Sequence, residues 1–457
     1  MRTGSLGWNM LSLNEIVEVL EAELIGTDAT FDNVSTDTRK VRKGDLFVAL
    51  KGENFDGADF VIDAAEKGAV AAIVERKVES SIPLLIVKDA RIALGKLASF
   101  WLGRFDIPII AVTGSNGKTT TKEMLAGILR EKGEVLSTQG NLNNDIGVPL
   151  TLFRLTEAHR FAVIEMGMNH PGEIGYLCKI AAPDVALVTN AASAHLQGLG
   201  SVEAVARAKG EIFEGLKEEG IAVVNADDAF APLWKNLAAK RKIIDFGLEH
   251  EAQVSAECVM DEFESTVNMR TPQGKLAVKL AVPGLHNVKN ALAATAAACA
   301  LGIDAESIRA ALEKFTGVAG RMQRRKGMKG AVLIDDTYNA NPESVKAAIS
   351  WLSSAKGKTV LILGDMGELG ADAEKLHGEI GVAAREAGIG ALLTLGKLSS
   401  IAAESFGRGE PFTDADELSA KAASIIDAET TVLVKGSRFM KMERIVEKLE
   451  EREKACC

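Results

Sequence analysis

Short apolar runs alternate with amphipathic stretches along almost the whole chain. Near the N-terminus, residues 44–50 have the pattern of a turn leading into a strand, and residues 58–67 have the spacing of an amphipathic helix. This alternation predicts a small α/β domain over residues 1–107.

The alternation continues through the middle of the chain. Helical stretches such as residues 201–216 separate a series of β-rich runs, at residues 107–113, 161–165, 185–189 and 221–225. Strands that alternate with helices favour a mostly parallel sheet. We therefore expect a central domain over residues 108–318.

A fresh series of strands begins after residues 317–321. Apolar runs with helices between them follow at residues 331–335, 359–364, 391–396 and 431–436. The pattern predicts a third, doubly wound domain over residues 319–457. The expected fold class is therefore α/β with three domains.

Composition and charge narrow the class of protein. The 457 residues are 47% hydrophobic, 25% charged and 5% aromatic, as in an ordinary soluble α/β enzyme. The net charge of −10 offers no basic surface for nucleic acid. No run approaches the ~18 apolar residues of a membrane span, and no signal peptide is recognised. The five cysteines form no C-x-x-C pattern, so we expect a cytoplasmic enzyme with reduced thiols and no membrane span.

A glycine-rich loop follows the apolar run at 107–113 and precedes the helical pattern at 122–129. It consists of Gly114, Ser115, Asn116, Gly117, Lys118, Thr119 and Thr120. Such a loop turns backbone N–H groups toward a phosphate, while Lys118 reaches the β/γ oxygens and Thr119 holds Mg²⁺. Val112 stands where the full Walker A pattern has glycine, so an ordinary glycine turn is the alternative. The flanking strand and helix favour a nucleoside triphosphate site.

Polar residues at two strand ends are candidates for a metal site. Glu165 ends one apolar run, and Asn190 ends another that leads to His195. Ligands bind at the carboxyl edge of such sheets, so these side chains can converge on Mg²⁺, although Glu165 can instead cap a loop. Lys209 falls on a predicted helix, where residue pattern alone indicates an exposed lysine.

Two further segments carry candidate ligand-binding groups. Residues 335–342 follow the first strand of the third domain and are rich in Asp and Asn, although a solvated turn is the alternative. Asn287 and Asn290 lie three residues apart and share one face of a predicted helix. Helix capping alone can explain one of them.

Six motifs match one family in order and spacing, at residues 113–120, 140–149, 208–212, 284–291, 335–342 and 434–438. The chain resembles the Mur ligases of peptidoglycan synthesis, and among them those that add D-alanyl-D-alanine to UDP-MurNAc-tripeptide. The motifs at 140–149 and 338–342 separate it from the sister ligases.

The resemblance implies an N-terminal domain that binds the UDP-sugar and a central ATPase domain. It also implies a Rossmann-like C-terminal domain that carries the dipeptide. A carboxylate of the tripeptide would attack ATP, and the amine of D-alanyl-D-alanine would attack the resulting acyl phosphate. The cofactors implied are ATP and Mg²⁺, and the implied state is a monomer. Whether diaminopimelate or lysine is the third residue of the peptide stays open.

The resemblance also assigns residues. Besides the loop, the implied ATP-binding residues are Asn287, Asn290, Arg321, Asp336, Tyr338 and Asn339. The implied catalytic residues are Lys118, Glu165, His195 and Lys209. The implied metal ligands are Thr119, Glu165 and His195, together with Lys209 if CO₂ carbamylates it. The implied substrate-binding residues are Ser35, Thr36, Asp37, Thr38, Arg39, Asn141, Asn143, Asn144, Asp145, Asn341, Lys435, Ser437 and Arg438.

Two other functions stay open. A nucleotide-dependent switch would release phosphate without any amino-acid acceptor. Another amide ligase of the same superfamily, such as the tripeptide-forming ligase or a folylpolyglutamate synthetase, would use a different acceptor.

Overall fold

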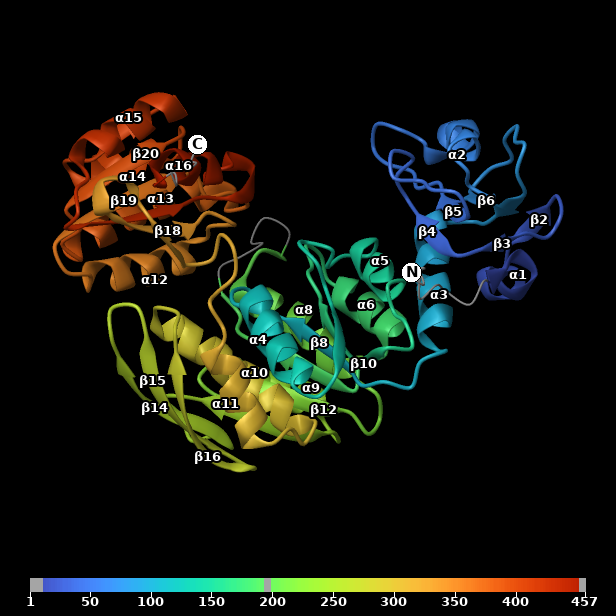
Figure 1. Ribbon diagram of the computed structural model, residues 1–457, viewed down its shortest axis with the longest axis horizontal. Coiled ribbons are helices and arrows are strands. Elements are labelled where there is room, and N and C mark those ends of the chain that lie inside the picture. The colour runs from blue at the N-terminus through green and yellow to red at the C-terminus, as the bar shows by residue number, and fades with distance from the viewer. Residues whose placement is uncertain (1–10, 193–198, 452–457) are drawn as a thin grey trace, which may run out of the picture.

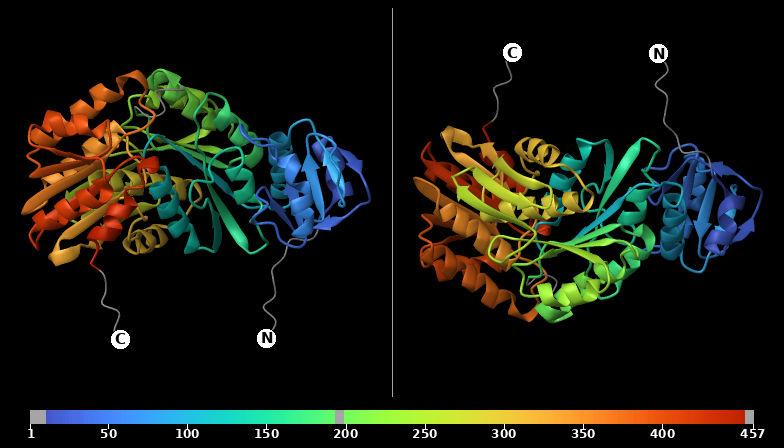
Figure 2. Two further views of the ribbon diagram at one scale, coloured as in Figure 1. Left: turned by 90° about the horizontal axis from the view of Figure 1, so that it is seen from above. Right: turned by 90° about the horizontal axis from the view of Figure 1, so that it is seen from below.

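The computed structural model describes residues 11–192 and 199–451. In these ranges the strands form three large sheets of five, nine and six strands and one two-stranded ladder. The prediction of an α/β chain with three domains is confirmed. Figures 1 and 2 show the central domain between the N-terminal domain, in blue, and the C-terminal domain, in orange and red.

The N-terminal sheet has the order β2-β7-β6-β5-β4 and is parallel except at β2. Its strands are β2 (Glu23–Ile25), β4 (Asn33–Ser35), β5 (Asp45–Val48), β6 (Ala71–Val74) and β7 (Leu84–Ile86), beside the ladder β1 (Leu11–Ser12) and β3 (Thr30–Phe31). Its helices are α1 (Leu13–Leu20), η1 (Gly57–Phe60), α2 (Val61–Glu66) and α3 (Ala90–Leu102). The predicted helix at 58–67 is thus a 3₁₀ turn followed by a short α-helix.

The central sheet has the order β16-β15-β14-β13-β12-β11-β8-β10-β9. Its strands are β8 (Ile109–Thr113), β9 (Glu134–Ser137), β10 (His159–Glu165), β11 (Val185–Val188), β12 (Ile221–Asn225), β13 (Lys242–Gly247), β14 (Val254–Met260), β15 (Ser265–Thr271) and β16 (Gly274–Leu280). The strands from β9 to β14 are parallel, whereas β14, β15 and β16 are antiparallel to one another. The predicted mostly parallel sheet is confirmed, with an antiparallel extension that the prediction did not include.

Helices cover both faces of the central sheet. They are α4 (Lys118–Arg130), α5 (Gly147–Leu152), α6 (Glu173–Ala181), α8 (Val202–Glu214), α9 (Ala231–Ala238), α10 (Leu285–Ala300) and α11 (Ala305–Glu313). Helices α4, α10 and α11 share one apolar core, and α6, α8 and α9 belong to the other. Helix α3 packs against α5 and α6, so the second core continues into the N-terminal domain.

The C-terminal sheet has the order β17-β18-β22-β19-β20-β21 and is parallel from β18 onward. Its strands are β17 (Gln323–Lys326), β18 (Val332–Asp336), β19 (Lys358–Gly364), β20 (Ala391–Leu395), β21 (Glu410–Phe412) and β22 (Thr430–Lys435). The helices are η2 (Met328–Gly330), α12 (Pro342–Ser353), η3 (Gly370–Asp372), α13 (Ala373–Glu386), α14 (Ser399–Phe406), α15 (Ala415–Ile425), η4 (Arg438–Met440) and α16 (Glu443–Leu449). Separate apolar cores lie on the two faces of this sheet, as expected for a doubly wound domain.

The turn between β14 and β15 packs against the C-terminal domain. The ring of Phe263 in this turn lies 6.1 Å from the ring of Trp351 on α12. The indole Nε1 of Trp351 donates a hydrogen bond to the carbonyl oxygen of Glu262 at 3.1 Å. The guanidinium of Arg324 stacks on Phe263 from the other domain, 4.0 Å from the ring centroid.

Within the described ranges, no helix is long and apolar enough to cross a membrane.

Candidate active site

The glycine loop lies between β8 and α4, as its position in the sequence predicts. Gly114 and Gly117 have φ angles of 150° and 81°. A Cβ atom at Gly114 would collide with Thr189, and one at Gly117 would collide with Asn290. Glycine is therefore required at both positions, by backbone conformation and by space.

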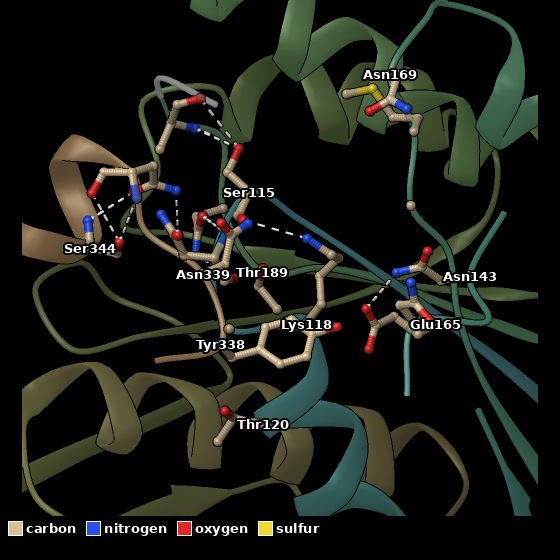
Figure 3. Close-up of a pocket in the computed structure, with 18 of the residues that line it drawn as sticks. Ser115, Lys118, Thr120, Asn143, Glu165, Asn169, Thr189, Tyr338, Asn339 and Ser344 are labelled. Carbon is tan, nitrogen blue, oxygen red and sulfur yellow. Dashed lines mark hydrogen bonds between the residues drawn. The ribbon is translucent and has the colours of Figure 1, made fainter. Parts of the chain in front are cut away.

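Lys118 is the first residue of α4 and points into the space beside the loop (Figure 3). Its Nζ donates a hydrogen bond to the carbonyl oxygen of Gly114 at 2.7 Å. Burial lowers the pKa of Lys118, and the nearby Glu165 carboxylate opposes this shift. The lysine thus supplies its charge beside the free N–H groups at the start of a helix, where anions bind.

Glu165 faces the loop from the end of β10. Its Oε2 accepts a hydrogen bond from the Thr119 hydroxyl at 2.8 Å, and its Oε1 accepts one from Nδ2 of Asn143 at 2.9 Å. The side chains of Glu165 and Thr119 are both buried. The prediction that Glu165 faces the loop from the strand end is confirmed.

Lys209 is buried, with 1% of its surface exposed, so the residue pattern's indication of an exposed lysine is wrong. It lies on the face of α8 that also buries Val205, Ile212 and Phe213. Burial lowers the pKa of Lys209 well below its ordinary value, and the charge of Lys118 lowers it further. Both effects favour the uncharged form of this amine. His195 lies outside the described residues.

Two residues of the C-terminal domain, Arg321 and Asn341, form hydrogen bonds with side chains of the glycine loop. The Nη2 of Arg321 donates a hydrogen bond to the Thr119 hydroxyl oxygen at 2.9 Å. The guanidinium stacks on Tyr338, 4.2 Å from the ring centroid. The Nε of Arg321 is buried and has no hydrogen-bond partner among the described residues. Asn341 also reaches the loop, because its Nδ2 donates to Oδ1 of Asn116 at 2.8 Å.

A buried ion pair joins two strand ends of the C-terminal sheet. The Nζ of Lys435, the last residue of β22, donates to Oδ2 of Asp336 at 2.6 Å and to the carbonyl oxygen of Asn339 at 2.9 Å. Ser437 donates to the carbonyl oxygen of Ala340 at 3.2 Å. The predicted residues of 336–339 and 435–437 thus form one connected group.

Asn287 and Asn290 share a face of α10, as their spacing predicts. The Nδ2 of Asn290 donates to Oδ1 of Asn287 at 3.3 Å, and Nδ2 of Asn287 donates to the carbonyl oxygen of Pro283 at 2.7 Å. Asn290 also accepts a hydrogen bond from the Thr121 hydroxyl at 3.4 Å. This second asparagine therefore borders the glycine loop.

A cavity of about 1440 Å³ lies beside the glycine loop, and residues of all three domains line it. The predicted residues Gly114, Thr119, Lys209 and Ser437 are not among its lining residues. The predicted residues that line it are Ser115, Asn116, Gly117, Lys118, Thr120, Asn141, Asn143, Asn144, Asp145, Glu165, Asn287, Asn290, Arg321, Asp336, Tyr338, Asn339, Asn341, Lys435 and Arg438. In the 141–145 loop, Asn144 accepts the N–H of Gly147 at 2.8 Å and Asp145 pairs with Arg91 of the N-terminal domain at 2.9 Å.

The predicted uridine-nucleotide motif, Ser35 to Arg39, follows β4 and does not line this cavity. Its own side chains organise it: Ser35 accepts the N–H of Asp37, and Asp37 pairs with Arg39 at 2.9 Å. This arginine lowers the pKa of Asp37 to about 2. The motif is thus a separate turn in the N-terminal domain.

The cavity lining also includes residues outside the predicted set, and two of them, His286 and Glu368, carry titratable side chains beside predicted residues. His286, at the start of α10, lies near Asp336 and Lys435, and burial lowers its pKa. Glu368 follows β19 and enters the cavity from the C-terminal domain. Both sit beside residues that were predicted, but only the folded chain shows that they face the same space.

Comparisons with known proteins agree with this architecture. Family models match at residues 30–101 (Mur ligase family, catalytic domain), 112–298 (Mur ligase middle domain) and 320–438 (Mur ligase, glutamate ligase domain). UDP-N-acetylmuramoyl-tripeptide–D-alanyl-D-alanine ligase of Escherichia coli strain K12 is 43% identical, over 96% of this chain and 98% of its own length.

Solved structures give the same result. The crystal structure of MurF from Acinetobacter baumannii matches with a TM-score of 0.92 and 36% identity, over 97% of this chain and 99% of that one. MurF from Thermotoga maritima in complex with ADP matches with a TM-score of 0.81 and 32% identity, over 91% and 96% of the chains.

The fold and the site define a ligase that uses ATP. The chain belongs to the Mur ligase family, in the group whose relatives are named UDP-N-acetylmuramoyl-tripeptide–D-alanyl-D-alanine ligase.

Proposed function

We propose that this protein joins D-alanyl-D-alanine to UDP-MurNAc-tripeptide at the expense of ATP. The products are UDP-MurNAc-pentapeptide, ADP and phosphate, within peptidoglycan precursor synthesis. The observation that carries the proposal is the meeting of Lys118, Glu165 and Arg321, from two domains, in a cavity that all three domains line. The relatives' shared name supplies the substrates. Residues of a single chain line the cavity, which fits a monomer. The use of ATP fits an enzyme that acts in the cytoplasm.

Each domain has a part in this proposal. Residues 1–107 bind the UDP end of the substrate through Ser35 to Arg39, and residues 108–318 bind ATP on the glycine loop. Residues 319–457 close over the nucleotide with Arg321, Asp336, Tyr338 and Asn339, and carry the dipeptide near Lys435, Ser437 and Arg438. The residues Asn141 to Asp145, Asn287, Asn290 and Asn341 complete the walls between them.

The oxygen donors beside the loop fit Mg²⁺. Thr119 Oγ1 and the Glu165 carboxylate are 2.8 Å apart, and hard oxygen ligands are those that Mg²⁺ prefers. These two residues would hold the ion, which would neutralise charge on the ATP phosphates.

Lys209 fits a further role at the same place. Its burial lowers the pKa of the amine and so favours the neutral form, which is the form that reacts with CO₂ to give a carbamate. The carbamate would be an anionic oxygen ligand beside Glu165, and the Lys118 charge that disfavours a cation at Lys209 would favour this anion. His195 would complete the set.

The chemistry follows from charge. The terminal carboxylate of the tripeptide attacks the γ-phosphate, and two anions must approach each other. Lys118 and the loop N–H groups offset the developing charge, and Arg321 adds an unpaired buried N–H. The acyl phosphate then reacts with the amine of the dipeptide, a tetrahedral intermediate collapses, and phosphate leaves. A closed C-terminal domain would keep water from the acyl phosphate.

The test is to incubate the protein with ATP, Mg²⁺, UDP-MurNAc-tripeptide and D-alanyl-D-alanine, and to follow the nucleotide product by mass. Tripeptides ending in diaminopimelate and in lysine are used in parallel. The proposal predicts a product heavier by one dipeptide residue. A product formed with single amino acids but not with the dipeptide would contradict it, as would phosphate release without any acceptor.

A further inference from the structure

Two neighbouring loops of the C-terminal domain bring opposite charges to the cavity. Glu368 lies in the loop that follows β19, and Arg438 lies in the loop that follows β22. These strands pair in parallel, so both loops leave the same edge of the sheet. Both residues line the cavity.

Hydrogen bonds fasten the two loops together next to these residues. The N–H of Gly367 donates to the Ser437 hydroxyl at 2.8 Å, and the N–H of Ser437 donates to the carbonyl oxygen of Asp365 at 3.1 Å. Each charged residue therefore directly follows a partner in the Gly367–Ser437 bond. These bonds hold the backbone of the two residues in neighbouring positions.

The backbone at Glu368 is held in an uncommon conformation. Its φ angle is 62°, in the left-handed region that a glutamate rarely adopts. The loop is fixed before it, where the N–H of Met366 donates to Nε2 of the buried His377 at 2.9 Å, and after it, where Leu369 is buried. The exposed side chain between these anchors is thus directed by the fold.

The Glu368 carboxylate lies near Lys118 of the glycine loop. Burial lowers the pKa of Lys118, and the charge of Glu368, like that of Glu165, opposes this shift, so Glu368 lies close enough to act on the loop lysine. The guanidinium of Arg438 lies 5.9 Å from the ring centroid of Tyr338. Its ion pair is with Glu443, at 3.1 Å.

The dipeptide substrate carries the matching charges. D-alanyl-D-alanine has an α-ammonium group at one end and a carboxylate at the other. An α-amino group has a pKa of about 8, so at neutral pH most of it is protonated and has no lone pair for attack. The site must therefore remove a proton at the end that approaches the acyl phosphate.

We propose that Glu368 binds the ammonium group of the incoming dipeptide and accepts its proton, while Arg438 binds the dipeptide's carboxylate. This inference rests on the proposed function. One N–H proton moves to a carboxylate oxygen of Glu368, and the nitrogen lone pair forms the C–N bond. The bond between the acyl carbon and the phosphate oxygen then breaks, and a second N–H proton leaves to the released phosphate.

The test compares Glu368→Gln with Glu374→Gln, which removes the same charge from an exposed position on α13 of the same domain. Each variant is assayed with D-alanyl-D-alanine and, separately, with hydroxylamine. Hydroxylamine is largely unprotonated at neutral pH and traps the acyl phosphate as a hydroxamate without a base.

For Glu368→Gln we expect kcat/KM for the dipeptide to fall by roughly 10²-fold or more, the usual effect of removing a general base. Hydroxamate formation should stay within about twofold of the native rate. Ligation by the variant should recover as the pH rises through about 8, because the free amine then forms in solution. Glu374→Gln should behave like the native protein.

A native rate of dipeptide ligation in Glu368→Gln would overturn the proposal. So would an equal loss of ligation and hydroxamate formation, because Glu368 would then act before the amine arrives. Failure of the native protein to ligate the dipeptide would instead contradict the proposed function, so the two failures are distinct.

The carboxylate end is tested with Arg438→Gln and with the dipeptide amide, D-alanyl-D-alaninamide. We expect the variant to raise KM for D-alanyl-D-alanine by roughly tenfold or more, because a charge-assisted hydrogen bond to the substrate carboxylate is lost. KM for the amide should be nearly unchanged. An equal effect on both substrates would contradict the role of Arg438.

Discussion

The side-chain amide of Asn341 donates a hydrogen bond to Oδ1 of Asn116 at 2.8 Å, and this bond joins the C-terminal domain to the glycine loop. The same asparagine begins α12, because its Oδ1 accepts the N–H of Ser344 at 2.9 Å. One side chain therefore both caps a helix and contacts the nucleotide site.

These two roles can be separated by substitution. Asn341→Asp keeps the oxygen that caps α12 but loses the donor to Asn116, and it adds a negative charge near the ATP phosphates. We expect KM for ATP to rise by about tenfold or more, while the free energy of unfolding stays within ~0.5 kcal/mol of the native value. Steady-state kinetics and chemical denaturation measure the two effects.

The matched variant Asn341→Ala loses both contacts. It should lower the free energy of unfolding by about 1 kcal/mol, the usual cost of losing an N-cap. A native KM for ATP in Asn341→Asp would contradict the role of the interdomain bond.

Lys118 should be needed for the reaction but not for binding the UDP-substrate. Because its charge offsets the attack of one anion on another, Lys118→Ala should lower kcat by roughly 10²–10³-fold or more. The dissociation constant for UDP-MurNAc-tripeptide, measured by titration calorimetry, should stay within about twofold. Loss of that binding in a folded variant would contradict the assignment of the UDP-substrate to the N-terminal domain.

A carbamate at Lys209 would make the enzymatic activity depend on CO₂. Because burial lowers the pKa of Lys209 and so favours the uncharged amine that reacts with CO₂, native protein kept in CO₂-free buffer should lose activity and regain it on addition of bicarbonate. Lys209→Arg cannot form a carbamate and should be inactive with or without bicarbonate. Activity of native protein that is indifferent to CO₂ would contradict the carbamate.

The buried His377 should make the stability of the folded protein depend on pH. Its Nε2 accepts the N–H of Met366 and its Nδ1 lies 2.7 Å from the carbonyl oxygen of Ala373, so these partners select the neutral ring with the proton on Nδ1. Burial lowers the pKa of His377 in the folded protein. The unfolded chain therefore binds a proton more readily, and the stabilisation is complete above about pH 6.5 and is lost as the pH falls through the lower folded pKa.

The free energy of unfolding should consequently fall with a slope of up to about 1.4 kcal/mol per pH unit from this group below pH 6.5. His377→Gln keeps a donor and an acceptor but does not titrate, so its stability should change less between pH 7.5 and 5. Equal slopes for the two proteins would contradict this account.

Much of the site can be predicted from local patterns in the sequence. The glycine loop lies between an apolar run and a helix, and Glu165 ends a neighbouring strand, so both must reach the same edge of a parallel sheet. Asn287 and Asn290 follow from helical spacing alone.

Other features required the folded chain. A lysine on a predicted helix is expected to be exposed, yet the spacing of Lys209 from Val205, Ile212 and Phe213 matches one apolar face of that helix. Buried and exposed residues alternate along the antiparallel strands β15 and β16. The sequence prediction did not include these strands because it relied on strands that alternate with helices. The approach of Asn341 and Arg321 to the loop depends on how two domains pack, and no local pattern records it.

The most direct test of the central claim is the fate of the oxygen atoms in the tripeptide's terminal carboxylate. UDP-MurNAc-tripeptide labelled with ¹⁸O in that carboxylate is converted to product with ATP and D-alanyl-D-alanine, and the released phosphate is analysed by mass. An acyl phosphate requires that one labelled oxygen leave with each phosphate. Unlabelled phosphate, released while the pentapeptide forms, would contradict attack of this carboxylate on ATP.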